Sequence, residues 1–143
     1  MIFNEFFNKI ESSNAFKNFK ETHENAEFCA GFFIIDFLTT DDKQTLDYKV
    51  GDKIFTFSLD HNNEIVIQED KLMDLPGRPK LTLIKNPEEI ITNLDELKGL
   101  IGTYALDQGI KDKFHKIIAV LQNNPKNEQE KIWNLTCMLD GLT

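Results

Sequence analysis

The N-terminal segment has the hydrophobic period of a helix. Four apolar side chains recur at i, i+3, i+4 and i+7, namely Phe3, Phe6, Phe7 and Ile10. The stretch Ser12-Ser13-Asn14 interrupts this pattern, and Ser13 can cap a second helix that carries Phe16 and Phe19. The sequence therefore predicts one kinked helix or two short helices before a polar stretch at residues 22–25.

Between residues 28 and 68 the pattern changes to that of β-strands. Residues 28–37 are apolar in both alternating sets, which is typical of a central strand covered on both faces. Three further strand-like segments follow at residues 46–50, 55–59 and 64–68, separated by short polar turns. Because such short turns join antiparallel neighbours, this region is predicted to be a four-stranded meander.

A second unit of helix and strands is predicted after a proline-containing connector. Pro76 and Pro79 exclude a regular helix or central strand there, although residues 81–84 could form a short strand. Asn86-Pro87 followed by two glutamates is typical of a helix start. The buried stripe of this helix is expected at Ile90, Leu94, Leu97, Ile101 and Tyr104.

Residues 114–121 fit both a helix and a buried strand. A hairpin-like loop at residues 123–127 and an alternating segment at residues 132–139 follow them. We therefore interpret residues 114–139 as a strand hairpin.

These elements predict an α+β fold in which helices pack on an antiparallel sheet. The expected order is a helix plus a four-strand meander, then a helix plus a hairpin, within a single domain spanning residues 1–143. Residues 1–70 form the first unit, residues 71–86 the connector and residues 87–143 the second unit. A chain of 143 residues buries roughly two-thirds of its unfolded surface, and we expect most of the 12 phenylalanines in that core.

Charge and hydropathy exclude two classes of partner. The formal net charge is −8, and the lysines alternate with acidic residues, whereas a nucleic-acid interface needs clustered basic residues. An anionic membrane surface is disfavoured for the same reason. No stretch reaches the ~18 consecutive apolar residues of a transmembrane helix. We expect neither nucleic acid nor a membrane as partner.

The cysteines and the N-terminal residues favour the cytoplasm. The first five residues, Met1-Ile2-Phe3-Asn4-Glu5, lack the basic region that opens a signal peptide. Cys29 and Cys137 lie among large apolar residues, as reduced buried thiols do, and a disulfide would require their strands to be neighbours. We expect a cytoplasmic protein in which both remain reduced.

No arrangement of residues with catalytic or metal-binding spacing is apparent. His23, His61 and His115 are far apart in the sequence, and the apolar neighbours of both cysteines disfavour a reactive thiolate. Asp41 and Asp42 could suggest a divalent cation, but no segment has the alternating oxygen ligands and central glycine of a calcium loop. We predict no catalytic site, no metal and no cofactor.

Several core segments resemble a family of small, uncharacterised archaeal proteins with a PepSY-like or cystatin-like arrangement. The resemblance covers most of the chain from Phe16 onward and rests on residues 26–33, 46–48, 54–57, 117–122 and 132–136. It implies a helix packed across an antiparallel sheet and a role in binding other proteins. Members of this kind usually carry one more strand after the tryptophan-containing one. Either this protein lacks that strand, which would leave an open edge on the second unit, or its sequence has been shortened. The inhibitory Gln-Val-Gly loop of cystatins is absent.

Three functions therefore compete. The first is a non-catalytic protein-binding or regulatory module that acts through a sheet edge, with a protein partner or by self-association. Candidate partner-binding residues are Trp133, Asp36, Asp41 and Asp42, and of these Asp36 interrupts an apolar strand, where we favour an exposed strand end over a buried pair. The second is a carrier of a small apolar ligand held among the phenylalanines. A hydrolase is a remote third.

Overall fold

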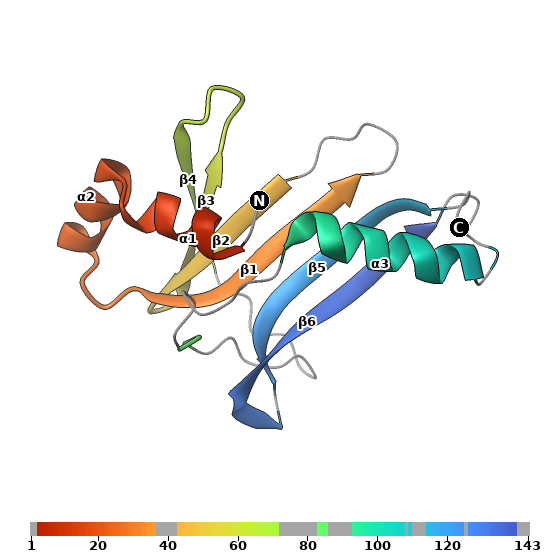
Figure 1. Ribbon diagram of the computed structural model, residues 1–143. Helices are drawn as coiled ribbons and strands as arrows, with labels where there is room; N and C mark the ends of the chain where they lie inside the picture. Colours follow the sequence, from red (N-terminus) through yellow and green to blue (C-terminus); the bar gives the residue numbers. More distant parts are fainter. Residues whose placement is uncertain are drawn as a thin grey trace.

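Six strands form one antiparallel sheet in the order β4-β3-β2-β1-β5-β6 (Figure 1). The computed structural model describes residues 3–36, 43–71, 83–85, 93–107, 109, 114–124 and 126–139. The strands are β1 Glu27–Asp36, β2 Lys43–Val50, β3 Lys53–Leu59, β4 Ile65–Lys71, β5 Phe114–Asn124 and β6 Asn127–Leu139. The α+β class, the four-strand meander and the later hairpin are thus confirmed, and the pairing of β1 with β5 joins the two predicted units in one sheet.

Two separate helices precede the sheet. They are α1, Phe3–Glu11, and α2, Asn14–Thr22. The hydroxyl of Ser13 donates a hydrogen bond to the carbonyl of Ile10 (2.6 Å) and accepts one from the N–H of Phe16 (3.1 Å), so this side chain closes the first helix and caps the second. The predicted apolar face of α1 is buried at all four positions: Phe3, Phe6, Phe7 and Ile10.

β1 lies at the centre of the sheet and contains a β-bulge. Its register with β2 shifts between Phe28 and Ala30, which makes Cys29 the extra residue. Phe28 and Phe33 therefore lie on the same face, and both rings contact Phe3 of α1 with centroids 6.2 Å apart. After the bulge, alternate residues of β1 are buried and the residues between them are only half-buried. The predicted coverage of both faces therefore holds around the bulge but not along the whole strand.

The core lies between the helices and one face of the sheet and is built mainly of phenylalanine rings. Nine of the 12 phenylalanines belong to it: Phe3, Phe6, Phe7, Phe16, Phe19, Phe28, Phe33, Phe55 and Phe57. The rings meet in tilted and edge-to-face pairs, such as Phe19 and Phe57 at 5.0 Å. The expected burial of most phenylalanines is confirmed.

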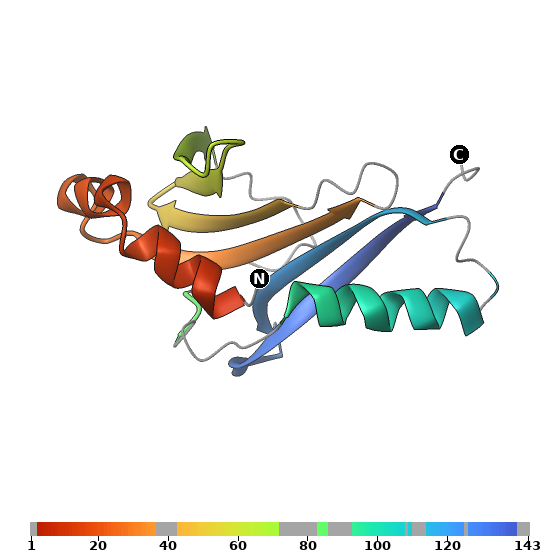
Figure 2. The ribbon, with the colours of Figure 1, turned by 45° about the horizontal axis from the view of Figure 1, so that its top comes forward.

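α3, Leu94–Asp107, lies on the same side of the sheet as α1 and runs beside β5 and β6 (Figure 2). Ile101 is buried and Leu97 packs against the core, as predicted. Tyr104 is 61% exposed, so the predicted buried stripe is wrong at this position. The expected helix start at Asn86-Pro87 lies outside the described residues.

The connector contributes one buried anchor among its described residues, 83–85. The N–H of Ile84 donates a hydrogen bond to the carbonyl of Phe28 (2.8 Å), and the Ile84 side chain is 1% exposed. Over residues 83–84 the chain does not form the short strand predicted there.

Candidate functional site

β4 is an edge strand of the sheet that carries exposed apolar side chains. β4 ends the strand order and pairs with β3 over seven residue pairs without a bulge. Val66 is 38% exposed and Ile67 is 40% exposed. A long, regular edge strand presents unpaired N–H and C=O groups that invite pairing with another strand. β4 therefore has the geometry of a docking edge.

The β3–β4 turn fixes how this edge is presented. One carboxylate oxygen of Asp60 accepts hydrogen bonds from the N–H of Asn62 (2.8 Å) and the N–H of Glu64 (2.9 Å). Asn63 adopts a left-handed backbone with φ of 60°, which asparagine tolerates better than most residues. β4 therefore starts immediately after the turn, and its first residues are apolar.

Charge is divided along β4. Its first half is the apolar run Ile65-Val66-Ile67, and its second half contains the exposed acids Glu69 and Asp70, followed by Lys71. The carboxylate of Glu69 forms an ion pair with the ammonium of Lys53 on β3 (2.8 Å). This ion pair offsets the charge of Glu69, so β4 has an apolar end and a charged end at which Asp70 is the acid without an ion pair among the described residues.

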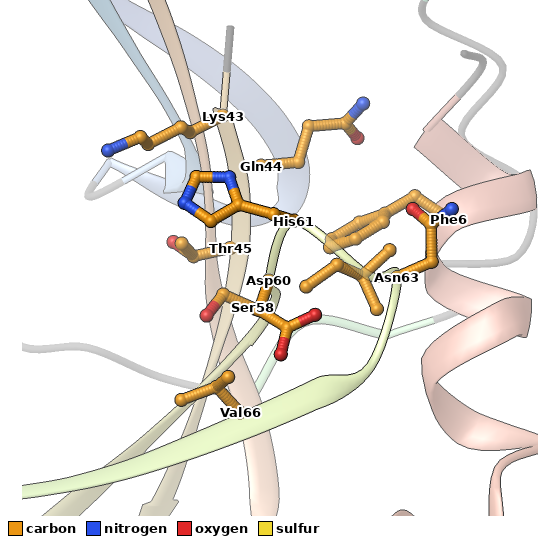
Figure 3. A pocket seen from close by; sticks show the side chains of 10 residues that line it. Phe6, Lys43, Gln44, Thr45, Ser58, Asp60, His61, Asn63 and Val66 are labelled. Atoms are coloured by element: carbon orange, nitrogen blue, oxygen red, sulfur yellow. The ribbon is translucent and has the colours of Figure 1, made fainter. Parts of the chain in front are cut away.

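A hollow of about 510 Å³ lies at the turn end of this hairpin, between β2 and α1 (Figure 3). Its lining is mixed in chemistry and comes from α1, β2, β3, the turn and β4: Phe6, Lys43, Gln44, Thr45, Ser58, Leu59, Asp60, His61, Asn63 and Val66. Among these side chains, Asp60 already stabilises the turn. The hollow can hold a small polar group next to the β3–β4 turn.

Gln44 carries an unsatisfied polar atom beside this hollow. Its Oε1 is buried and finds no hydrogen-bond partner among the residues that the structure describes. A buried acceptor without a donor costs roughly 1–3 kcal/mol of stability. Because Oε1 is buried, a ligand in the hollow could not reach it, and the unsatisfied atom does not point to a ligand.

A second hollow of about 260 Å³ lies between the two N-terminal helices and the connector. Phe7, Phe16 and Phe28 contribute apolar walls, and Glu11 and Lys20 contribute charges. The ammonium of Lys20 already donates to two backbone carbonyls, those of Glu24 and Ala26. The polar groups at this hollow therefore serve the fold.

The predicted partner-binding residues do not come together on one described surface. Trp133 packs against the core, stacked on Phe33 with ring centroids 5.0 Å apart and an interplanar angle of 17°. Asp36 is the last residue of β1, as expected, but it is half-buried rather than exposed, and it pairs in register with Lys116 of β5. Asp41 and Asp42 lie outside the described residues.

Histidines and cysteines are also dispersed. His23 ends α2 and packs on Phe19 at 4.8 Å, while His61 lies in the β3–β4 turn. Cys137 pairs with Ile117 on β5, and β5 separates β6 from β1, so the strands of Cys29 and Cys137 are not neighbours. Within the described ranges, His, Cys, Asp and Glu form no group of three that could hold a metal ion.

Sequence reasoning located β4 but missed its exposure. The available signal was the run Ile65-Val66-Ile67, which is apolar in both alternating sets next to a turn. In a central strand such a run is buried on both faces, whereas at an edge it leaves apolar side chains in solvent. Strand order decides between these outcomes, and the sequence does not reveal it.

Comparison with known proteins finds no family model, no curated protein and no solved structure that matches this chain. Among the described helices, none has the length and apolarity required to cross a bilayer.

Proposed function

We propose that this protein is a non-catalytic binding module that receives an extended segment of a partner protein at the outer edge of β4. The observation that carries the proposal is the exposure of Val66 and Ile67 on a regular edge strand. In strand addition, the edge backbone supplies the hydrogen bonds and the alternate side chains supply specificity. Both features are present at β4.

The packing of the core favours this function over a carrier of an apolar ligand. Phenylalanine rings fill the space between the helices and the sheet, with centroids such as those of Phe7 and Phe28 only 5.3 Å apart. The two hollows described above have mixed rather than apolar linings. An apolar ligand would therefore have to displace well-packed side chains.

The PepSY-like or cystatin-like assignment is part of the same proposal. Helices on one face of an antiparallel sheet agree with that arrangement, and the resemblance itself implies protein binding. The docking edge that we propose belongs to the first unit, at β4. Trp133, on the opposite edge strand, packs inward against Phe33.

Selection of peptides from a random displayed library, followed by mapping of the bound site, tests the proposal. We expect the selected peptides to slow amide hydrogen exchange in β4 and to bind the Ile67→Lys variant at least about tenfold more weakly, since a lysine on an edge opposes strand addition. The matched control is Leu100→Lys, which places the same charge at a 71% exposed apolar site on α3. Selected peptides that protect another segment, or that bind both variants like the wild type, would contradict the proposal.

A further inference from the structure

The division of charge along β4 specifies the strand that it receives. We propose that the partner segment pairs antiparallel with β4 and is basic in its first part and apolar in its second part. This inference rests on the proposed function. It adds the direction, the residue order and the charge of the partner.

The direction follows from the rest of the sheet. Every neighbouring pair from β4 to β6 is antiparallel, and antiparallel pairing is slightly more stable per residue than parallel pairing. In that direction the partner's first residues lie opposite Asp70 and Glu69. Its later residues lie opposite Ile67, Val66 and Ile65.

The charge of the partner follows from Asp70, near the end of β4. Asp70 is exposed and, within the described part of the chain, its carboxylate forms no ion pair. Its charge also contributes to raising the pKa of Asp47, so the Asp70 carboxylate lies near a second acid. Opposite charges placed directly across two strands stabilise the pair, whereas like charges destabilise it. A lysine or arginine opposite Asp70 is therefore favoured.

A second copy of this chain fits the edge less well. Two β4 strands paired antiparallel about Gln68 would place the carboxylates of Glu69 and Asp70 against the apolar Ile67 and Val66. A pair centred on Ile67 would place Glu64 against Asp70, which brings like charges together. A pair centred on Val66 avoids both conflicts but leaves the charged end opposite the β3–β4 turn, outside the strand. The full length of β4 thus suits a heterologous strand.

Three short peptides of related composition test the predicted order of basic and apolar residues in the partner strand. They are acetyl-Lys-Lys-Thr-Val-Ile-Val-amide, its reversed sequence, and the version with glutamates in place of the lysines, each carrying a fluorophore for anisotropy. We expect the basic-first peptide to bind at least about tenfold more tightly than the other two, with an affinity that falls as salt screens the charges. Asp70→Asn should weaken that peptide about threefold, while the control Asp95→Asn on α3 should leave it unchanged.

Each result decides the inference. Equal binding of the basic-first and reversed peptides, or no effect of Asp70→Asn, would overturn it even if library-selected peptides still map to β4. Self-association of the wild type in light scattering that disappears in Ile67→Lys would assign the edge to a second copy instead. If no peptide of either kind maps to β4, the proposed function fails together with the inference.

Discussion

The hydroxyl of Tyr48 donates a hydrogen bond to Oε2 of Glu11 over 2.8 Å, which links the sheet to the end of α1. Tyr48 is 2% exposed, and burial together with the nearby charge of Glu11 raises the pKa of its phenol. The phenol therefore remains protonated and keeps its role as donor. This contact and the packing of the ring against Phe16 position the N-terminal helices on the sheet.

Replacing Tyr48 by phenylalanine should lower the free energy of unfolding by about 1–2 kcal/mol, because a hydrogen bond to a charged acceptor is lost while the ring remains. Urea unfolding followed by circular dichroism measures the difference. Tyr104→Phe is the matched control, since this tyrosine is exposed on α3, and its effect should stay within about 0.5 kcal/mol. Equal effects of the two substitutions would show that the contact with Glu11 contributes nothing.

The two N-terminal helices were predictable because the residues that define each of them are close together in the sequence. The spacing of Phe3, Phe6 and Phe7 and the capping hydroxyl of Ser13 are contained within one or two helical turns, and the structure follows them. The bulge at Cys29 was not predictable, because it depends on how β1 aligns with β2 eighteen residues later. The exposure of Tyr104 has a similar origin, since it depends on which face of α3 meets the sheet.

Asp47 should make stability depend on pH. Burial is the main cause that raises the pKa of its carboxyl, the charge of Asp70 adds to this, and the hydrogen bond from Thr56 (2.7 Å) opposes it. A raised pKa in the folded state means that folding favours the protonated form. The stabilising contribution of Asp47 is thus fully present below the ordinary pKa near 3.8 and is lost as the pH rises through the folded-state value.

Asp47→Asn, which cannot ionise, is therefore expected to be more stable than the wild type at pH 7, with a difference that shrinks towards pH 3. Urea unfolding at several pH values measures this, and Asp52→Asn, in the exposed β2–β3 turn, controls for the loss of one surface charge. A difference between Asp47→Asn and the wild type that is constant with pH would contradict the assigned cause.

Cys29 should be chemically inert in the folded protein. Burial, aided by the charge of Asp47, raises the pKa of its thiol to about 12, so very little reactive thiolate exists at neutral pH. In a Cys137→Ser background, an aromatic disulfide reagent at pH 8 should label Cys29 slowly in buffer and rapidly in denaturing urea. Labelling in buffer at the rate of a free thiol would show that the bulge exposes this cysteine.

The candidate site was less predictable than the fold for a physical reason. Trp133 was a candidate because tryptophan is common at binding surfaces, but its register opposite Leu121 places the ring on the helix-covered face against Phe33. Val66 and Ile67 carry no polar or catalytic signal, and only their position at the end of the strand order exposes them. Binding edges of this kind arise from topology, which single-sequence patterns do not encode.

Gly31 should be intolerant of any side chain. A Cβ at this position would lie 3.0 Å from Cε2 of Phe3, which is itself only 1% exposed, so the ring of α1 would have to move. Gly31→Ala should therefore destabilise the protein by about 1–3 kcal/mol, the usual cost of overpacking. Gly99→Ala is the matched control, because no atom lies within 4 Å of the added Cβ on α3, and there we expect a gain of about 0.5–1 kcal/mol from helix propensity.

Combining Gly31→Ala with Phe3→Leu separates crowding from other causes. The smaller, more flexible side chain leaves room for the new methyl group, so the double variant should lose less stability than the sum of the two single losses. Additive losses would show that crowding by Phe3 is not the reason why position 31 requires glycine. A loss in the double variant that is smaller than the sum would establish that this approach sets how α1 docks on the sheet.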